Sequence, residues 1–206
     1  ILAVWRGLHV ESVENMQRRI VDIAFSPTGS VLAVGFYFPG TVKCFDVATG
    51  QTLSEIEFGA TIYSVAFSPR GTVAVGGGNE VMFYDGSTGR LQHELRPDWL
   101  DGSPSNIYVS TLCFSPDGST IAANTEDSRS KSIDIYDAET GELFRVIGRP
   151  CLGIQAAAFS ADGKSIALGD WVSLRGGGKL ALYDVETLDL RRMQRQQQAS
   201  PAAPTA

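Results

Sequence analysis

The sequence contains a short motif that occurs four times at nearly even spacing. Its first copy is Ile23–Gly29 (IAFSPTG), and the later copies are Val65–Gly71 (VAFSPRG), Leu112–Gly118 (LCFSPDG) and Ala157–Gly163 (AAFSADG). The phenylalanines of these copies, at positions 25, 67, 114 and 159, lie 42, 47 and 45 residues apart. Self-similarity with a period in the forties indicates a repeat architecture, in which every unit is one supersecondary element that packs on its neighbours.

A second motif, an aromatic residue followed by aspartate, comes later in each repeat. Its copies are Phe45-Asp46, Tyr84-Asp85, Tyr136-Asp137 and Tyr183-Asp184. In the first three copies a glycine follows the aspartate by four positions, which is typical of a tight turn whose carboxylate accepts backbone N–H groups. The fourth copy has Leu188 instead of glycine, so a looser hairpin is expected there. Because all four aspartates recur in one context, we interpret them as turn-capping rather than catalytic residues.

Each repeat is expected to form four short β-strands. Short segments rich in Val, Ile, Phe and Leu alternate with turn residues, and no stretch keeps a helical period. This pattern excludes helical repeats and predicts units at 20–58, 62–95, 109–148 and 154–193, with a weaker last strand. Residues 1–19 are expected to form half of another unit, since Ile1–Arg6 aligns with the third strand of the last repeat. The inner strands of that half unit would precede Ile1, which predicts a partial ring.

The two linked motifs resemble those of the WD-repeat β-propeller family, and the resemblance covers roughly residues 1–190. It implies an all-β fold, a β-propeller whose four-stranded antiparallel blades are arranged radially. The expected architecture is four full blades plus an N-terminal half blade, as part of a larger ring. The sequence lacks the Gly-His dipeptide of the family and has Phe-Asp or Tyr-Asp instead of Trp-Asp. The family's buried His–Ser/Thr–Asp network therefore has no counterpart residues in this chain.

Charge and composition limit the classes of partner. The chain has 17 Lys and Arg against 23 Asp and Glu, a formal net charge of −6, which argues against nucleic-acid and anionic-membrane partners. No apolar run approaches the roughly 20 residues of a membrane span. Residues 194–206, rich in Gln, Ala and Pro, are predicted to be a disordered tail. The odd set of Cys44, Cys113 and Cys151, without a Cys-x-x-Cys pair, favours a reducing, cytoplasmic location.

The sequence offers little catalytic chemistry. His9 and His93 fall in different predicted blades, without a partner at metal-ligand spacing, and are interpreted as exposed strand residues. No Gly-x-Ser-x-Gly motif is present, and no helix follows either glycine run to form a phosphate site. Cys113 stands where the other copies have alanine and is interpreted as a small core residue. We therefore expect no catalytic, metal-binding or cofactor-binding residues.

Binding residues are expected in the connections of variable length. In a propeller blade the connections from fourth strand to next first strand, and from second to third strand, emerge on one face. Insertions confined to one face often mark a binding surface. Aromatic and arginine residues dominate binding hot spots. The candidates of this kind, with one leucine, are Tyr37, Phe38, Arg96, Trp99, Leu100, Tyr108, Arg129, Trp171 and Arg175. Alternatively, each of these side chains only covers the end of a blade or fills the centre.

The favoured function is a non-catalytic protein–protein interaction scaffold that presents this loop face to protein or peptide partners. The alternative is a propeller enzyme or small-ligand binder with a site in the central funnel, which converging His, Asp, Glu or Arg side chains would reveal. A lipid-headgroup binder is a third class, disfavoured by the acidic charge. The sequence leaves the oligomeric state and the identity of the partners open.

Overall fold

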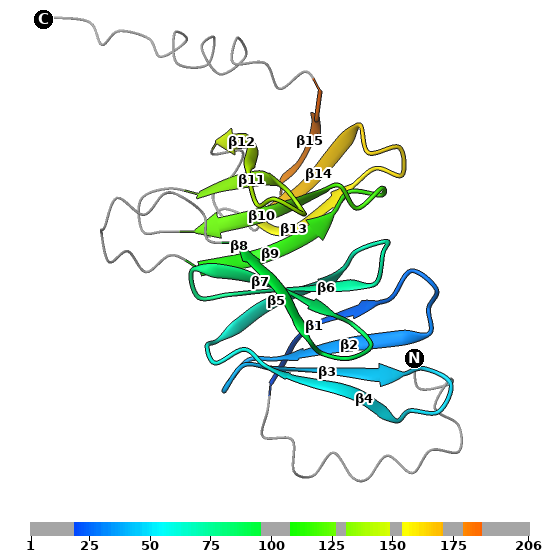
Figure 1. Cartoon of the computed structure of the whole chain (residues 1–206). Coiled ribbons are helices and arrows are strands. Elements are labelled where there is room, and N and C mark those ends of the chain that lie inside the picture. The colour runs from blue at the N-terminus through cyan, green and yellow to red at the C-terminus, as the bar shows by residue number, and fades with distance from the viewer. Residues whose placement is uncertain (1–18, 96–107, 127–130, 149–153, 171–178, 187–206) are drawn as a thin grey trace, which may run out of the picture.

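A computed structural model describes residues 19–95, 108–126, 131–148, 154–170 and 179–186 of the chain (Figure 1). Within these ranges every regular element is a β-strand. The strands form three four-stranded sheets and one three-stranded sheet, and each sheet pairs consecutive strands antiparallel. The all-β fold predicted from the repeats is confirmed.

The sheets follow one another along the chain as blades. Blade 1 consists of β1 (Ile20–Phe25), β2 (Val31–Phe36), β3 (Thr41–Asp46) and β4 (Thr52–Glu57). Blade 2 consists of β5 (Ile62–Phe67), β6 (Thr72–Gly77), β7 (Glu80–Asp85) and β8 (Leu91–Leu95). Blade 3 consists of β9 (Tyr108–Phe114), β10 (Thr120–Glu126), β11 (Lys131–Asp137) and β12 (Leu143–Gly148). The described part of blade 4 consists of β13 (Ile154–Phe159), β14 (Ser165–Asp170) and β15 (Lys179–Asp184).

The first strands of successive blades are neighbours. β1 contacts β5, β5 contacts β9, and β9 contacts β13, so these four strands form the inner side of an arc of blades (Figure 1). This is the radial arrangement of a β-propeller.

Two blade edges differ from the predicted bounds by one residue. β9 begins at Tyr108 rather than at residue 109, because Tyr108 pairs with Glu126 of β10. β4 ends at Glu57 rather than at residue 58, and the Phe58 N–H instead donates to the Gly40 carbonyl oxygen over 2.8 Å. The predicted half blade, apart from Arg19, the last strand of blade 4 and the tail at 194–206 lie outside the described residues and stay predictions.

The repeated motifs form the two hairpin turns of each blade. In the first copy the Gly29 N–H donates to the Ser26 carbonyl oxygen over 2.8 Å, and the Val31 N–H donates to Ser26 Oγ over 2.9 Å. Gly29 has a φ of 71°, a conformation that glycine adopts without steric cost. This turn chemistry explains why serine and glycine recur at these positions.

The aspartates of the second motif cap their turns, as predicted. Asp46 Oδ1 accepts the Thr49 N–H over 2.7 Å, and the corresponding threonine N–H groups donate to Asp85 and Asp137 over 2.8 Å. Hydrogen bonds from Ser87 and then from Thr88 lower the pKa of Asp85 to about 2. In the fourth copy the Glu186 N–H donates to Asp184 Oδ1 over 2.9 Å, and the remainder of that turn lies outside the described residues.

The core consists of the joints between blades. The two faces of a blade are defined by their neighbours: the back face packs on the following blade and the front face on the preceding one. At the first joint Val42 and Cys44 of β3 are fully buried in one cluster with Val73 and Val75 of β6. Equivalent clusters form the second and third joints. Hydrophobic burial at these repeated joints stabilises the arc.

A single position in the second strand shows how closely the blades approach. At Gly76 of β6 an added Cβ would lie 2.9 Å from Val109 Cγ1 of the following blade, so a side chain there requires repacking. The equivalent residue of blade 3 is Asn124, whose Nδ2 donates to Ser110 Oγ over 2.6 Å and to the Ile154 carbonyl oxygen over 3.2 Å. A polar bridge thus replaces close backbone packing at the third joint.

Candidate functional site

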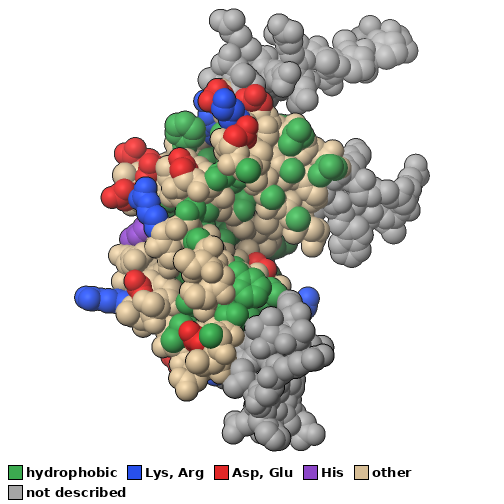
Figure 2. Space-filling view, turned by 90° about the vertical axis from the view of Figure 1, so that its right-hand side faces the viewer, with side chains coloured by type: hydrophobic (Ala, Val, Ile, Leu, Met, Phe, Trp, Pro, Cys, Tyr) green, Lys and Arg blue, Asp and Glu red, His purple; other side chains and the backbone are tan. Residues whose placement is uncertain are grey.

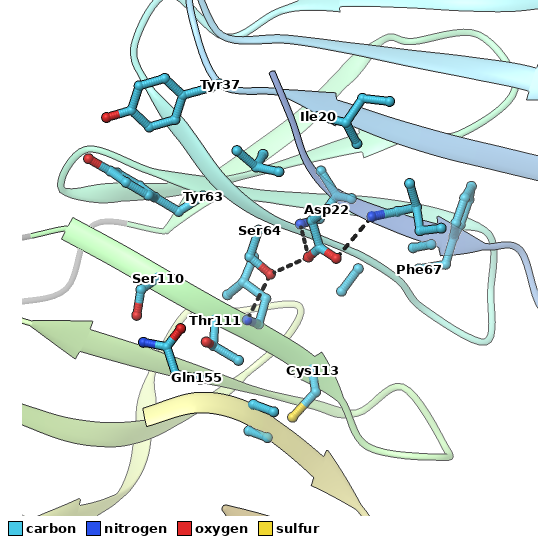
Figure 3. A pocket seen from close by; sticks show the side chains of 18 of the residues that line it. Ile20, Asp22, Tyr37, Tyr63, Ser64, Phe67, Ser110, Thr111, Cys113 and Gln155 are labelled. Atoms are coloured by element: carbon cyan, nitrogen blue, oxygen red, sulfur yellow. Dashed lines mark hydrogen bonds between the residues drawn. The ribbon is translucent and has the colours of Figure 1, made fainter. Parts of the chain in front are cut away.

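The inner strands of the four blades line an open groove of about 820 Å³ (Figure 3). Its walls come from β1, β5, β9 and β13, and its rim includes Tyr37, which follows β2. This groove lies where the central funnel of a propeller is expected. It is therefore the place to search for the converging polar groups of an enzyme site.

The groove contains a hydrogen-bonded chain that joins three blades (Figure 3). Asp22 Oδ2 of β1 accepts the Ser64 hydroxyl of β5 over 2.9 Å and the Val65 N–H over 2.9 Å. Ser64 Oγ in turn accepts the Leu112 N–H of β9 over 3.1 Å. A carboxylate, a hydroxyl and a backbone amide thereby link blades 1, 2 and 3.

These bonds show what the Asp22 carboxylate does in the groove. Its second oxygen, Oδ1, accepts the N–H of the adjacent Ile23 over 2.9 Å, so both oxygens accept hydrogen bonds. The equivalent residues are Ser64, Thr111 and Ala156, and three of these four positions carry a polar side chain. That recurrence, three residues before the phenylalanine of each repeat, was the sequence signal that could have revealed the chain of bonds.

A tyrosine cluster lies at the rim of the groove on the loop face. Tyr37 contacts Tyr63 edge-on, with ring centroids 5.8 Å apart, and Tyr63 lies 5.1 Å from Tyr108 at a 36° tilt. The Arg19 guanidinium lies over the Tyr37 ring, 5.5 Å from its centroid. Burial, followed by the neighbouring Tyr37, raises the pKa of Tyr63. Three blades therefore contribute one aromatic cluster.

The structure places three of the predicted binding residues. Tyr37 and Tyr108 belong to the tyrosine cluster, where Tyr63 joins them, and Phe38, the residue after Tyr37, is 69% exposed. Tyr108 is the first residue of β9 rather than part of a loop. Sequence reasoning missed Tyr63 because it was assigned to a strand, not to a connection. The other candidates, Arg96, Trp99, Leu100, Arg129, Trp171 and Arg175, lie outside the described residues.

His93 is not the exposed strand residue expected from the sequence. It is half-buried, its ring stacks on Phe83 with centroids 4.2 Å apart at 10°, and its Nε2 lies 2.9 Å from the Ala138 carbonyl oxygen. Because a carbonyl oxygen only accepts, Nε2 carries the proton. The residue following β11 covers this part of β8, which explains the burial. His93 therefore helps to join blades 2 and 3.

Cys113 and Asp134 are further groups with perturbed acidity. Cys113 is half-buried: it packs against the cluster of the third joint and also lines the groove, and burial raises the pKa of its thiol to about 12. Asp134 of β11 is buried and accepts the Thr125 hydroxyl over 3.1 Å, and burial raises its pKa as well. Asp134 is not among the residues that line the groove.

Other site types find little support in the part of the chain that the structure describes. No cluster of three or more His, Cys, Asp or Glu residues able to hold a metal ion occurs there. No helix among the described residues is long and apolar enough to cross a membrane. On the face drawn in Figure 2, acidic, basic and hydrophobic side chains of the described residues are interspersed.

Comparisons with known proteins agree with the repeat motifs and the blades. The family model of the anaphase-promoting complex subunit 4 WD40 domain matches residues 2–70, and that of the WD domain, G-beta repeat, matches residues 97–137. The small ribosomal subunit protein RACK1y of Oryza sativa subsp. japonica is 31% identical over 106 residues, covering 51% of this chain and 31% of its own length. The WD repeat-containing protein VIP3 of Arabidopsis thaliana is 26% identical over 151 residues, covering 68% of this chain and 46% of its own.

A solved structure has a similar fold. The chain superposes on Kuenenia stuttgartiensis hydrazine synthase with a TM-score of 0.71 at 21% identity, covering 88% of this chain and 49% of that one. At this identity the likeness concerns the fold alone. The chain thus spans between about a third and a half of the length of these proteins. The repeated motifs, the radially arranged blades and the matches to two WD40 family models together support a WD-repeat family for this chain.

Proposed function

We propose that the chain is a non-catalytic scaffold that binds protein or peptide partners through its loop face. The observation that carries this proposal is the cluster of Tyr37, Tyr63 and Tyr108 beside the exposed Phe38. Tyrosine side chains supply rigid apolar area together with a hydroxyl, and tyrosine is enriched among binding hot spots. This cluster extends across the ends of three blades, which suits an extended peptide segment.

The candidates outside the described residues belong to the same proposal. Arg96, Trp99 and Leu100 lie in the connection from blade 2 to blade 3, and Arg129, Trp171 and Arg175 lie in connections between second and third strands. In propeller blades connections of both types emerge on one face, and we expect these to lie on the side of the tyrosine cluster. They would enlarge the same binding surface.

Three considerations support a binding rather than a catalytic role. The carboxylate in the groove, that of Asp22, is engaged in joining blades, and the described residues lining the groove include no histidine. The similarity to an enzyme, hydrazine synthase, is a likeness of fold at 21% identity. The name of the rice relative places that protein in the small ribosomal subunit, a large assembly, which supports an interaction role and a cytoplasmic location.

Affinity capture with the tagged full chain tests the proposal. The variant Phe38→Ser changes a side chain that is 69% exposed on the loop face, and its matched control is Phe144→Ser on β12, 59% exposed. We expect Phe38→Ser to capture roughly tenfold less of the proteins that wild type and control both capture, as quantified by mass spectrometry. A tenfold loss corresponds to a hot spot of about 1.4 kcal/mol. The melting temperatures of all three proteins should agree.

Tyr63→Ala and the pair Trp99→Ala with Arg175→Ala extend the test to the cluster and the loops. Loss of capture in a variant that remains folded would support the loop face as the binding surface. Unchanged capture by Phe38→Ser and by both of these variants would show that partners bind elsewhere. A turnover of substrate that depends on groove residues would replace the scaffold with the alternative, an enzyme of the central funnel.

A further inference from the structure

A cleft of about 260 Å³ opens between blades 2 and 3 at the hairpin ends of their strands. Its walls come from the β5–β6 turn and β8 of blade 2 and from the β11–β12 turn of blade 3. The β5–β6 and β9–β10 hairpins lie side by side there (Figure 1), since a Cβ added at Gly118 would be 3.0 Å from Pro69 Cδ. The cleft is thus at the opposite end of the blades from the tyrosine cluster, and every residue that lines it belongs to blade 2 or 3.

Aromatic rings form the floor of this cleft. The His93 ring stacks on Phe83, and Phe114 meets the Phe83 ring edge-on, with centroids 6.2 Å apart. His93 and Phe114 are half-buried, so both rings keep surface that an apolar group can cover. The bond between His93 Nε2 and the Ala138 carbonyl oxygen holds the imidazole in place.

Hydrogen-bonding groups lie on the two walls. On the blade 2 wall, Gln92 Oε1 accepts the Thr72 hydroxyl over 3.2 Å, which leaves the two Nε2 hydrogens to donate to a ligand. Arg70 on the same wall is exposed, and it forms no ion pair with a carboxylate of the described residues. Glu139 on the blade 3 wall is exposed and likewise has no ion-pair partner in the described part of the chain. The cleft therefore offers donors on one wall and an acceptor on the other.

Arg70 does not take the turn-closing role of its counterparts in the other repeats. There the equivalent side chain accepts the N–H two residues later, at 3.4 Å for Thr28, 3.0 Å for Asp117 and 3.1 Å for Asp162. The blade 2 hairpin is one residue shorter, and an arginine side chain has no acceptor atom. Arg70 is therefore available to a ligand rather than committed to its own turn.

This set of groups distinguishes the second joint from the other two. The residues at the positions of Arg70, Gln92 and Glu139 are Thr28, Leu53 and Ser87 at the first joint, and Asp117, Phe144 and Glu186 at the third. Neither of these sets includes a basic residue. Groups that differ where the turn-forming residues recur indicate a role other than joining blades.

We propose that the cleft binds the C-terminal residue of a partner peptide, one with an apolar side chain. Its carboxylate would accept hydrogen bonds from Arg70 and Gln92, and its own N–H would donate to Glu139. Its side chain would cover the rings of the aromatic floor. A volume of about 260 Å³ is below that of pockets for drug-sized ligands, which suits a single residue.

The arrangement favours a chain end over an internal acidic residue. At a C-terminus the carboxylate and the N–H are attached to the same Cα, so one residue reaches both walls. In an internal Asp or Glu the carboxylate belongs to the side chain, which leaves no apolar group for the aromatic floor. The site is separate from the loop face, so the proposal does not depend on what binds to the tyrosine cluster.

Fluorescence anisotropy of labelled peptides with the full chain tests the proposal. The probes are short glycine–serine peptides that end in Leu, Val or Phe, each made as the free acid and as the C-terminal amide. We expect at least one free acid to bind and its amide to bind at least about tenfold more weakly, because the amide lacks the charge that Arg70 would recognise. Arg70→Gln should weaken binding of the acid by a similar factor. The matched control Arg90→Gln changes an exposed arginine that does not line the cleft, and it should bind like wild type.

Competition with two other carboxylates distinguishes a chain end from its alternatives. Displacement of the peptide by free leucine at equal concentration, or by an amidated peptide with an internal glutamate, would overturn the assignment to a C-terminal residue. Equal binding of acid and amide, no binding of any probe up to about 1 mM, or unchanged binding by Arg70→Gln would overturn it as well. Circular dichroism establishes that each variant is folded, and the comparison of acid with amide uses the wild-type chain alone.

Discussion

Replacement of Asp22 by alanine should loosen the joint between blades 1 and 2. The carboxylate accepts the Ser64 hydroxyl and the Val65 N–H, both over 2.9 Å and both from β5. Alanine removes this acceptor, so the Ser64 hydroxyl and the Val65 N–H of the neighbouring blade lose their hydrogen-bond partner. Ser64 is 4% exposed, so its hydroxyl has little access to water as a substitute.

The cost follows from the two lost bonds. A hydrogen bond to a charged group contributes about 1.5–3 kcal/mol, and the open groove favours the lower end of that range. We therefore expect Asp22→Ala to lower the free energy of unfolding by about 3 kcal/mol. For a domain of this size, each kcal/mol corresponds to about 2–4 °C, which gives a fall in melting temperature of roughly 6–12 °C.

Urea unfolding and calorimetry of the full chain measure this effect. The matched control is Asp117→Ala, which removes a carboxylate bonded to Ser115 and Ser119 within one exposed hairpin and should cost about 1 kcal/mol or less. A double-mutant cycle with Ser64→Ala should give a coupling of about 1 kcal/mol or more. A change in the free energy of unfolding below about 0.5 kcal/mol for Asp22→Ala, or no coupling energy with Ser64→Ala, would refute the role of these hydrogen bonds in joining the blades.

Three further predictions concern single residues. Gly40→Ala should lower the free energy of unfolding by more than about 3 kcal/mol in urea titrations, since Gly40 has a φ of +81° and its added Cβ would lie 1.7 Å from the Ala60 carbonyl oxygen. Gly59→Ala, with a similar φ of +80° and open space, should cost only about 1 kcal/mol. The pKa of Asp85, lowered to about 2, lies below its ordinary value, so its stabilisation is present above about pH 4 and is lost as the pH falls toward 2. Asp85→Asn should therefore unfold with a weaker dependence on pH in that window, and an unchanged dependence would contradict the capping role. Because the pKa of Cys113 is raised to about 12, iodoacetamide at pH 8 should alkylate this thiol far more slowly in the folded chain than in urea, as peptide mass spectrometry would show.

The repeat motifs were sufficient to predict the blades because the chemistry they encode is local. Ser26 and Gly29 close one hairpin through bonds that span at most five residues, and Asp46 caps the next turn within its own loop. Such bonds depend on neighbours in the chain, so their recurrence could be recognised in the sequence. In the structure the first strand of blade 3 begins at Tyr108 and the last strand of blade 1 ends at Glu57.

The candidate site was predicted only in part because it depends on contacts between blades. Tyr37 and Tyr108 stood out as aromatic residues near connections, whereas Tyr63 was hidden in a strand pattern. The burial of His93 could not be predicted for the same reason. Its ring stacks on Phe83 of its own blade, but its Nε2 contacts the Ala138 carbonyl oxygen, which is 45 residues away in the sequence.

The sequence by itself determined the repeat, the strands and the turns, since each follows from residues close together in the chain. The tertiary structure decided which side chains meet: Asp22 with Ser64, 42 residues later, and Tyr63 with both Tyr37 and Tyr108. These pairings depend on how one sheet stacks on the next, and stacking is set by the summed packing of whole blade faces.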